Sequence, residues 1–324
     1  MKAIVATKYG TPDVLELQEM TKPTPKDNEV LIKVLATSVN AADWHLLRGD
    51  PFMIRLLYGL FSPKNTILGA DIAGQVEAVG QDVKRFQVGD EIFGDNANGG
   101  FGGFAEYVCV QADGFVLKPK SLTFEQAAAV PMAAVTALQG LRTLGQIQSG
   151  QKVLIHGASG GVGTFAVQIA KSFDTQVTAV CSATKVEMMR SLGADHVIDY
   201  NREDFSKNGV QYDLILAANG NRSIYDYKRA LSPKGIYVMT GGSMRQIMQS
   251  LLLGPLISMT GTQKMLGLQA APNQKDLAFI NQLLETGKVV PVMDRSYPLN
   301  QVPDALRYLE QGHAKGKVVI SLAT

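Results

Sequence analysis

Apolar and polar positions follow one pattern in the first third of the chain and another in the middle. Before residue 123, short apolar runs alternate with turns that contain proline, glycine, aspartate or asparagine. Runs of this length between such turns predict β-strands. The predicted strands cover residues 3–7, 15–19, 30–38, 72–79 and 104–110. Many short strands in succession favour a small barrel-like domain.

After residue 123, segments with helical spacing alternate with apolar segments of strand length. Residues 123–145 are rich in alanine and predict a helix, with Ser121 or Thr123 as its N-cap. Strands are then predicted at 153–156, 177–181, 196–199, 214–217 and 236–240, and helices between them at 162–171, 185–192 and 224–231. Such alternation predicts an α/β fold with a doubly wound parallel sheet and right-handed crossovers.

The C-terminal part of the chain returns to the style of the first. Residues 264–269 predict an edge strand and residues 276–285 a helix, followed by strand 296–299, helix 303–311 and strand 317–322. The last three elements are predicted to complete the N-terminal domain. The predicted domains are therefore residues 1–123 with 270–324, and residues 124–269.

A glycine-rich turn at residues 156–163 leads from the strand 153–156 into the next helix. It reads His-Gly-Ala-Ser-Gly-Gly-Val-Gly. The free N–H groups at the start of that helix suit a phosphate, and glycine lets a pyrophosphate approach the backbone. An ordinary strand-to-helix turn is the alternative, but strand 177–181 completes the strand–helix–strand unit of the dinucleotide-binding fold. The pattern predicts a dinucleotide site.

Composition and charge narrow the class of protein. The chain has 324 residues, of which 46% are hydrophobic and 19% charged, as in globular proteins of two domains. A net charge of +2, with scattered lysine and arginine, argues against nucleic-acid binding. Cys109 and Cys181 lie in apolar runs and predict reduced, buried thiols and a cytoplasmic location. No signal peptide is predicted, and Gly254 and Pro255 interrupt the longest apolar stretch, so no membrane span is predicted either.

Several short motifs occur together in one known family. They are Asp71-Ile72-Ala73-Gly74, Val88-Gly89-Asp90, Gly102 to Tyr107, Ala127 to Pro131, Gly157 to Gly163, Ser191 to Asp195 and Gly312 to Lys317. Together they resemble the zinc-free quinone oxidoreductase branch of the medium-chain dehydrogenase/reductase superfamily, in the subgroup of the chloroplast envelope quinone oxidoreductase homologue and the reticulon-4-interacting protein. The resemblance implies a GroES-like β-barrel catalytic domain and a Rossmann coenzyme domain.

Zinc alcohol dehydrogenases share this superfamily, so metal binding must be considered. The resemblance places the family's catalytic cysteine at Asn40 and its histidine at Ala70, and the loop with four cysteines for structural zinc is missing. Zinc needs three or four ligands from cysteine, histidine or carboxylate. We predict no metal site and no zinc.

The residues after strand 177–181 indicate which nicotinamide cofactor binds. An NAD site carries an acidic residue there, but this chain has none. Ser182 and Thr184 offer hydroxyls and Lys185 a cation to a 2′-phosphate. In the quinone reductases a tyrosine also reaches this phosphate, and Tyr200 matches it. The alternatives are a solvated lysine at the start of a helix and a packing aromatic; the prediction is NADPH.

The resemblance assigns further cofactor contacts in three groups. One group binds the pyrophosphate, one lies on the nicotinamide side, and one closes over the cofactor from the C-terminal segment. The groups are Ser159, Gly160, Gly161 and Val162; Thr136, Asn219 and Gly241; and His313, Ala314 and Lys315.

Reduction without metal needs a hydride donor, stabilisation of negative charge and a proton source. Hydride addition to the β-carbon of an enone places charge on the carbonyl oxygen, and a quinone behaves similarly. Asn40, Tyr58 and the cofactor ribose hydroxyl are the candidate donors, and Tyr58 is also a candidate acid. Asp43 matches the family's acidic residue near the site and is interpreted as orienting the backbone. His45 is interpreted as a surface or packing residue.

Two apolar stretches, residues 51–61 and 244–259, bound the substrate. The first is unusually apolar for a loop and falls where the family lines its substrate cleft. Both are explained equally well as helices packed on the core or as a hydrophobic mouth that contacts a membrane surface peripherally.

The predicted function is reduction of hydrophobic quinones or α,β-unsaturated ketones and aldehydes by NADPH. The alternative is an NADPH-binding redox sensor or interaction protein with little turnover, and a zinc alcohol dehydrogenase is disfavoured. The edge strand 264–269 leaves both a homodimer and a monomer open.

Overall fold

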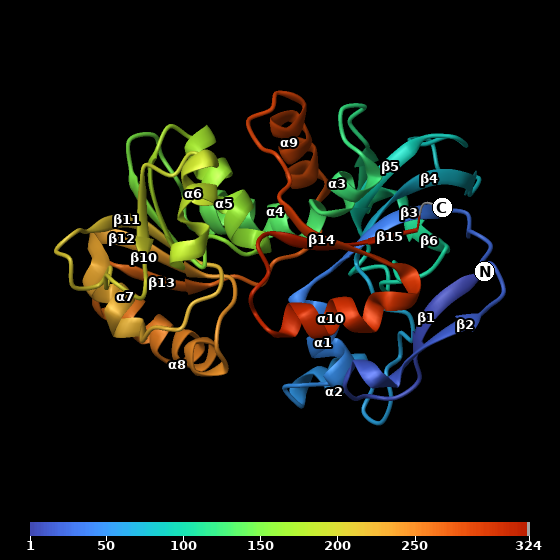
Figure 1. The fold of residues 1–324 in the computed structure, drawn as a ribbon, viewed down its shortest axis with the longest axis horizontal. Helices are drawn as coiled ribbons and strands as arrows, with labels where there is room; N and C mark the ends of the chain where they lie inside the picture. Colours follow the sequence, from blue (N-terminus) through green and yellow to red (C-terminus); the bar gives the residue numbers. More distant parts are fainter. Residues whose placement is uncertain (323–324) are drawn as a thin grey trace. The chain divides into compact units, whose positions relative to one another are not determined.

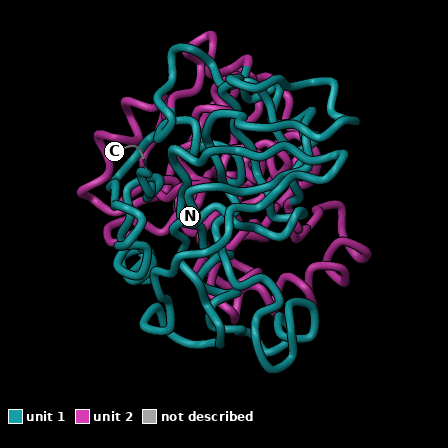
Figure 2. The backbone as a smooth tube through the Cα atoms, turned by 90° about the vertical axis from the view of Figure 1, so that its right-hand side faces the viewer, with its two compact units in different colours: residues 1–132, 271–281, 291–324 teal, residues 133–270, 282–290 magenta. Residues whose placement is uncertain are grey.

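Two compact units make up the chain (Figure 2). The structure, a computed structural model, describes residues 1–322. Unit 1 comprises residues 1–132, 271–281 and 291–324, and unit 2 comprises residues 133–270 and 282–290. The chain therefore leaves unit 1 for unit 2 twice, first at residues 133–270 and again at residues 282–290. The predicted domains, residues 1–123 with 270–324 and residues 124–269, stay a prediction; unit 2 begins at residue 133 and also includes residues 282–290.

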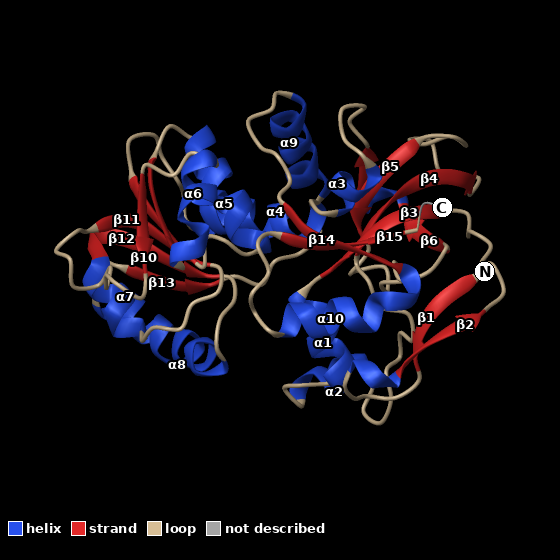
Figure 3. Cartoon of the chain, viewed as in Figure 1, coloured by secondary structure: helices blue, strands red, loops and turns tan. Residues whose placement is uncertain are grey.

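Unit 2 is built on a six-stranded parallel sheet (Figures 1 and 3). Its strands are β8 (Lys152–His156), β9 (Gln176–Cys181), β10 (His196–Asp199), β11 (Tyr212–Ala217), β12 (Leu231–Met239) and β13 (Lys264–Gly267). They lie in the order β10-β9-β8-β11-β12-β13. This order is that of the dinucleotide-binding fold, in which the strand order reverses between the first and fourth strands. The predicted doubly wound sheet, with its edge strand, is confirmed.

The helices in residues 131–285 include one turn of π-helix. They are α4 (Pro131–Leu138), a π-helical turn (Gln139–Leu144), α5 (Gly161–Ser172), α6 (Val186–Ser191), α7 (Ile224–Ala230) and α8 (Met244–Thr260), followed by α9 (Gln274–Glu285). The prediction of one helix over residues 123–145 was wrong. Thr123 caps a first helix, α3 (Phe124–Ala128), and Pro131, which has no N–H to donate into a preceding turn, starts a second one.

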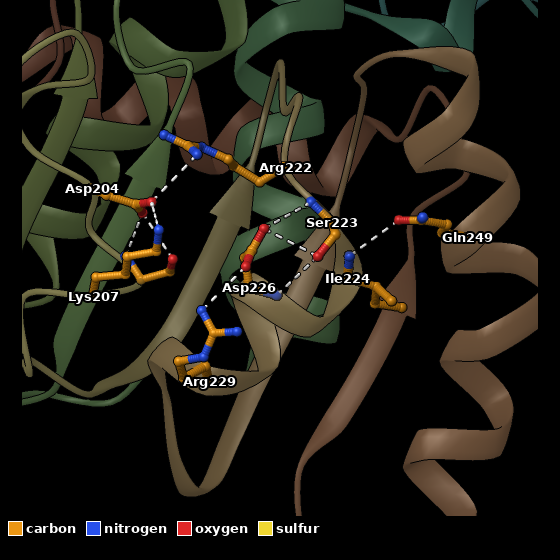
Figure 4. A network of polar contacts seen from close by, with 9 residues as sticks. Asp204, Lys207, Arg222, Ser223, Ile224, Asp226, Arg229 and Gln249 are labelled. Atoms are coloured by element: carbon orange, nitrogen blue, oxygen red, sulfur yellow. Dashed lines mark hydrogen bonds and ion pairs between the residues drawn. The ribbon is translucent and has the colours of Figure 1, made fainter.

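Polar contacts fasten α7 to its surroundings (Figure 4). The Ser223 hydroxyl caps the helix by accepting from the N–H of Asp226 at 3.2 Å. The N–H of Ile224, free at the helix start, donates to Oε1 of Gln249 on α8 at 3.1 Å. Arg222 pairs with Asp204 at 3.4 Å. The bond between Ile224 and Gln249 thus joins the start of α7 to α8.

Unit 1 contains a seven-stranded sheet and a separate two-stranded one. The strands are β1 (Lys2–Ala6), β2 (Leu15–Glu19), β3 (Glu29–Val39), β4 (Asp71–Val79), β5 (Glu91–Asp95), β6 (Tyr107–Gln111), β7 (Phe115–Leu117), β14 (Met293–Pro298) and β15 (Lys317–Ser321). The larger sheet has the order β14-β15-β3-β4-β5-β7, with β6 also on β3. Thus the C-terminal segment completes the N-terminal sheet, as predicted. The predicted strand at 104–110 begins only at Tyr107, because Ala105 bridges to Ala3 instead.

Unit 1 contains α1 (Ala41–Arg48), α2 (Met53–Tyr58), α3 and α10 (Val302–Glu310), and residues 274–281 of α9 also belong to it. A core cluster packs α1 and α10 together through Leu47, Leu306 and Val318. The prediction of a loop at residues 51–61 was incomplete, since it contains α2. Its apolar side chains are divided: Ile54 and Tyr58 pack against the core, whereas Leu57 is 74% exposed and Phe61 90%.

None of the helices described in residues 1–322 is long and apolar enough to cross a bilayer. Cys109 is half-buried and Cys181 is buried, and neither forms a disulfide within the described residues.

Candidate functional site

The glycine turn between β8 and α5 is shaped by close backbone contacts. Gly157 has a φ of 79°, which favours glycine. A Cβ on Gly163 would lie 2.2 Å from the carbonyl oxygen of Gly157, so only glycine lets the helix approach the strand here. Gly160 is the N-cap and makes no side-chain cap, so the first N–H groups of α5 have no capping side chain. Such N–H groups suit a pyrophosphate, and Ser159, Gly160, Gly161 and Val162 lie at this helix start.

The turn lies at the point where the strand order reverses. β8 has β9 on one side and β11 on the other, and Ala217 of β11 is in register with His156. The residues that follow these two strands therefore lie close together: a Cβ on Gly157 would lie 2.7 Å from the backbone nitrogen of Asn219. Gly241 follows β12, and its carbonyl accepts from the N–H of Gly220 at 3.4 Å. Ligands of doubly wound sheets bind in the crevice at this switch point.

A buried histidine lies directly before the glycine turn. Nδ1 of His156, the last residue of β8, lies 2.7 Å from the Tyr227 hydroxyl. Burial, with a smaller effect of Arg222, lowers the pKa of His156 to about 4, so the ring is neutral at pH 7. No role was predicted for His156 from the sequence. Its position directly before the glycine turn was the available signal.

The residues predicted for the 2′-phosphate come together at the end of β9. Ser182 and Thr184 lie 3.4 Å apart through their hydroxyl oxygens, in a short turn that also contains Lys185. Tyr200 follows β10 and donates its N–H to the carbonyl of Cys181 at 3.2 Å. Its side chain is 49% exposed. Two hydroxyls, a cation and a phenol thus lie at one edge of the sheet, with no acidic residue at positions 181–185. Thr136, the other predicted contact in this unit, is buried in α4.

Unit 1 contains a buried polar cluster around Asn40, the residue that follows β3. The backbone N–H of Asn40 donates to Oδ2 of Asp43 at 2.7 Å, and the N–H of Gly69 donates to Oδ1 of Asp43 at 3.1 Å. Asp43 is fully buried, and burial is the main cause that raises its pKa to about 7. Both of its carboxylate oxygens accept from backbone groups, so Asp43 fixes the start of α1.

Two residues of this cluster were missed by sequence reasoning. Asp71 accepts at Oδ2 from Ser38 at 2.6 Å, from Nδ2 of Asn40 at 2.9 Å and from Nζ of Lys317 at 3.1 Å. Lys317 also donates to Oδ1 of Asn40. Asp71 and Lys317 are separated by 246 residues, and each begins an apolar strand. A charged residue at the start of a buried strand is the signal that could have pointed to them.

Tyr58 lies apart from these contacts. It packs on the core beside Phe101, with ring centroids 6.1 Å apart, and lines a cavity of about 10 Å³ with Leu46 and Leu68. A cavity of this size holds at most one water molecule. His45 stacks on Trp44 at 3.6 Å and contacts the Asp50 carbonyl.

The C-terminal residues predicted to close over the cofactor belong to unit 1. The N–H of Lys315 donates to Oδ2 of Asp294 at 2.9 Å, and His313 and Ala314 precede it after α10. The contacts of these three residues with a cofactor stay a prediction.

The arrangement fits a dinucleotide and offers no metal site within residues 1–322. No group of three histidine, cysteine or acidic side chains among them could hold a metal ion. The glycines at positions 157 and 163, in contrast, let the turn, Asn219 and the first turn of α5 approach one another closely. Unit 2 therefore has the geometry of a dinucleotide site at its switch point, and unit 1 carries the buried polar cluster.

Two sequence families match the chain. Residues 26–120 match the family described as alcohol dehydrogenase GroES-like domain, and residues 192–320 match the family described as zinc-binding dehydrogenase. The chain is 35% identical to the chloroplastic NADPH-dependent alkenal/one oxidoreductase of Arabidopsis thaliana, over 99% of this chain and 79% of that protein. It is also 35% identical to the chloroplast envelope quinone oxidoreductase homologue of the same plant, over 99% and 98%.

Solved structures show the same similarity. The quinone oxidoreductase from Coxiella burnetii superposes with a TM-score of 0.89 at 30% sequence identity, covering 99% of each chain. The similarity therefore extends over both units.

Proposed function

The chain belongs to the medium-chain dehydrogenase/reductase superfamily, and we propose that it reduces quinones or the double bond of α,β-unsaturated ketones and aldehydes with NADPH. The predicted family, fold and oxidoreductase activity are confirmed by these relatives. The observation that carries the proposal is similarity over the whole chain to proteins named for both reactions. The alternative of a redox sensor with little turnover is not favoured.

The preference for NADPH over NADH is part of this proposal. A bound nicotinamide cofactor supplies the hydride. Ser182, Thr184 and Lys185 offer hydroxyl donors and a positive charge at the end of β9, where an NAD site would carry a carboxylate. The exposed Tyr200 follows the adjacent strand and adds a phenol. These groups suit a 2′-phosphate, because none of them carries the negative charge that would repel it.

Asn40 is the proposed donor to the developing oxyanion. When hydride reaches the β-carbon of an enone, negative charge accumulates on the carbonyl oxygen, and a fixed N–H group lowers the energy of that state. The buried Asn40 amide is fixed by Asp71 and Lys317. Asp43, whose two carboxylate oxygens accept from the N–H groups of Asn40 and Gly69, is proposed to orient the backbone of Asn40 and not to transfer a proton. Tyr58 stays only a second candidate for the hydrogen-bond donor or acid, because it packs beside a very small cavity.

We propose that the reaction is independent of zinc, although one matched family is described as zinc-binding. The family's ligand positions carry Asn40 and Ala70, neither of which is a ligand that zinc prefers. Elemental analysis of the purified protein checks this proposal, and stoichiometric zinc would contradict it.

Hydrophobic substrates are proposed because α2 and the residues after it present exposed apolar side chains, among them Leu56, Leu57 and Phe61. Three further predictions are unchanged: a homodimer or a monomer, with the edge strand β13 as a pairing site; a peripheral membrane contact; and a cytoplasmic location.

The initial rate of NADPH oxidation tests the function. A benzoquinone, a short alkenal, a long-chain enone and a saturated aldehyde are compared, with NADH as the alternative donor. Turnover of the enones or the quinone with NADPH, and none of the saturated aldehyde, is expected. Binding of NADPH without oxidation by any acceptor would restore the sensor alternative.

A further inference from the structure

The register of the unit 1 sheet brings three polar residues together at one end of adjacent strands. Val318 of β15 pairs with Val39 of β3, and Ser38 of β3 pairs with Asp71 of β4. Lys317 and Asn40 each lie one residue beyond a paired position. The fold therefore places an ammonium, an amide and a carboxylate side by side across three strands.

All three side chains are buried: Asn40 is 8% exposed, Asp71 0% and Lys317 3%. Charged groups are rarely buried without partners, and here each charge has one. Lys317 lies 3.1 Å from Asp71, and Ser38 and the N–H of Met132 add two more donors to Asp71. The contacts of the cluster therefore leave neither charge unpaired.

The chemistry of the two charged groups determines which way the amide of Asn40 points. An ammonium can only donate and an ionised carboxylate can only accept. Oδ1 of Asn40 must therefore face Lys317, and Nδ2 must face Asp71, as observed. A rotation of the amide by 180° would set oxygen against carboxylate and nitrogen against ammonium. One N–H of Nδ2 is used by Asp71, which leaves the second as the donor that the amide can offer.

We infer that Lys317 and Asp71 are positioning residues that lock the Asn40 amide with its free N–H directed for the reaction. This inference rests on the proposed function, in which Asn40 donates to the developing oxyanion. Neither positioning residue touches the substrate. The chain end thus takes part in catalysis through a residue that is 277 positions away in the sequence.

A double-mutant cycle tests the inference in the full-length protein. K317M, N40A and the double variant are compared in kcat for the best acceptor of the wild type and in the Kd of NADPH. Loss of one oxyanion donor costs on the order of 10²-fold in kcat, and we expect K317M to lose at least about tenfold. If Lys317 acts through Asn40, K317M in the N40A background costs little more, because effects within one unit are not additive. K317R keeps a donor and should recover most of the activity.

A control separates positioning from the general cost of losing a buried lysine side chain. The Lys118 side chain is as buried as that of Lys317, with 4% exposed, and pairs at 3.1 Å with Glu91, whose side chain is 46% exposed. K118M should leave kcat within about twofold of the wild type. If K317M does not fold, D71N supplies the test, since an amide at position 71 no longer dictates the orientation of Asn40. D71N should then lower kcat in the wild-type background and not in N40A.

Independent, multiplicative losses from K317M and N40A, or a D71N variant with wild-type kcat, would overturn the inference. A loss in K118M equal to that in K317M would also overturn it. Failure of the proposed function looks different: the wild type then oxidises NADPH with none of the quinone or enone acceptors, and the inference falls with it.

Discussion

Substitution of Gly163 by alanine should weaken both the fold of unit 2 and its affinity for NADPH. The added Cβ would lie 2.2 Å from the Gly157 oxygen and 2.6 Å from the carbonyl carbon of Ala158. Ordinary contacts begin near ~3.4 Å, so α5 and the turn must separate by roughly 1 Å, which forfeits a quarter to a half of the dispersion energy between them. α5 is well packed, with Phe165 and Val167 completely buried. We expect the free energy of unfolding to fall by about 2–3 kcal/mol, the upper part of the range for overpacking.

Gly160, three residues earlier in the same turn, is the matched control. A Cβ there would lie 3.7 Å from its nearest neighbour, and the φ of −84° suits alanine. Urea denaturation of the two variants, with and without saturating NADPH, gives both quantities. G160A should stay within about 1 kcal/mol of the wild type, since losing glycine at an N-cap and restricting the unfolded chain oppose each other. G163A should also gain less stability from NADPH. Equal stabilities of G160A and G163A would refute the steric reasoning.

Three further predictions concern charge, substrate and pH. K185E should raise KM for NADPH about tenfold or more and leave that for NADH nearly unchanged, because it sets a carboxylate beside the 2′-phosphate; equal effects on both cofactors would refute the assignment. Replacing both Leu56 and Leu57 by serine should raise KM for a long-chain enone more than KM for a short one, by roughly tenfold for each leucine side chain that the bound substrate would bury. Replacing the similarly exposed Val88 by serine should leave both KM values unchanged. Burial, with the charge of Asp71, raises the pKa of Asp95 to about 7. The stability that comes from the neutral form of Asp95 is complete below pH ~4 and is lost as the pH rises to about 7. The free energy of unfolding of D95N should therefore exceed that of the wild type by at most about 4 kcal/mol above pH 7, and the two should be equal near pH 4. The same difference at both pH values in urea denaturation would contradict this.

The fold of unit 2 was largely predictable because the sequence patterns that indicate its strands and turns are local. Each strand of its sheet is a short apolar run, and the glycine turn at 156–163 lies between a strand and a helix in sequence as in space. Boundaries were less accurate where residues of one type continue through a break. Alanines run from α3 to α4, and only Pro131 marks where one helix ends and the next begins.

The polar cluster of unit 1 could not be predicted in the same way. Asn40 was a candidate because it occupies a family position, but its partners Asp71 and Lys317 come from strands that are distant in sequence. Pairing between such strands depends on register, and register is fixed by the packing of the whole sheet. The exposure of α2 was likewise hidden, since an apolar run reads the same in sequence whether its side chains are buried or face water.

The path of the chain through β15 has a consequence for synthesis on the ribosome. β15 covers residues 36–39 of β3, and β6 covers residues 29–33 of the same strand edge. The first 132 residues emerge with the second half of that edge open, and the partner that closes it is made only after the whole of unit 2. An unpaired strand edge can pair with other chains during this interval. The continuous stretch 133–270 of unit 2 is synthesised earlier than β15. Translation therefore sets an order in which most of unit 2 can fold before β15 pairs with β3, the strand that precedes Asn40.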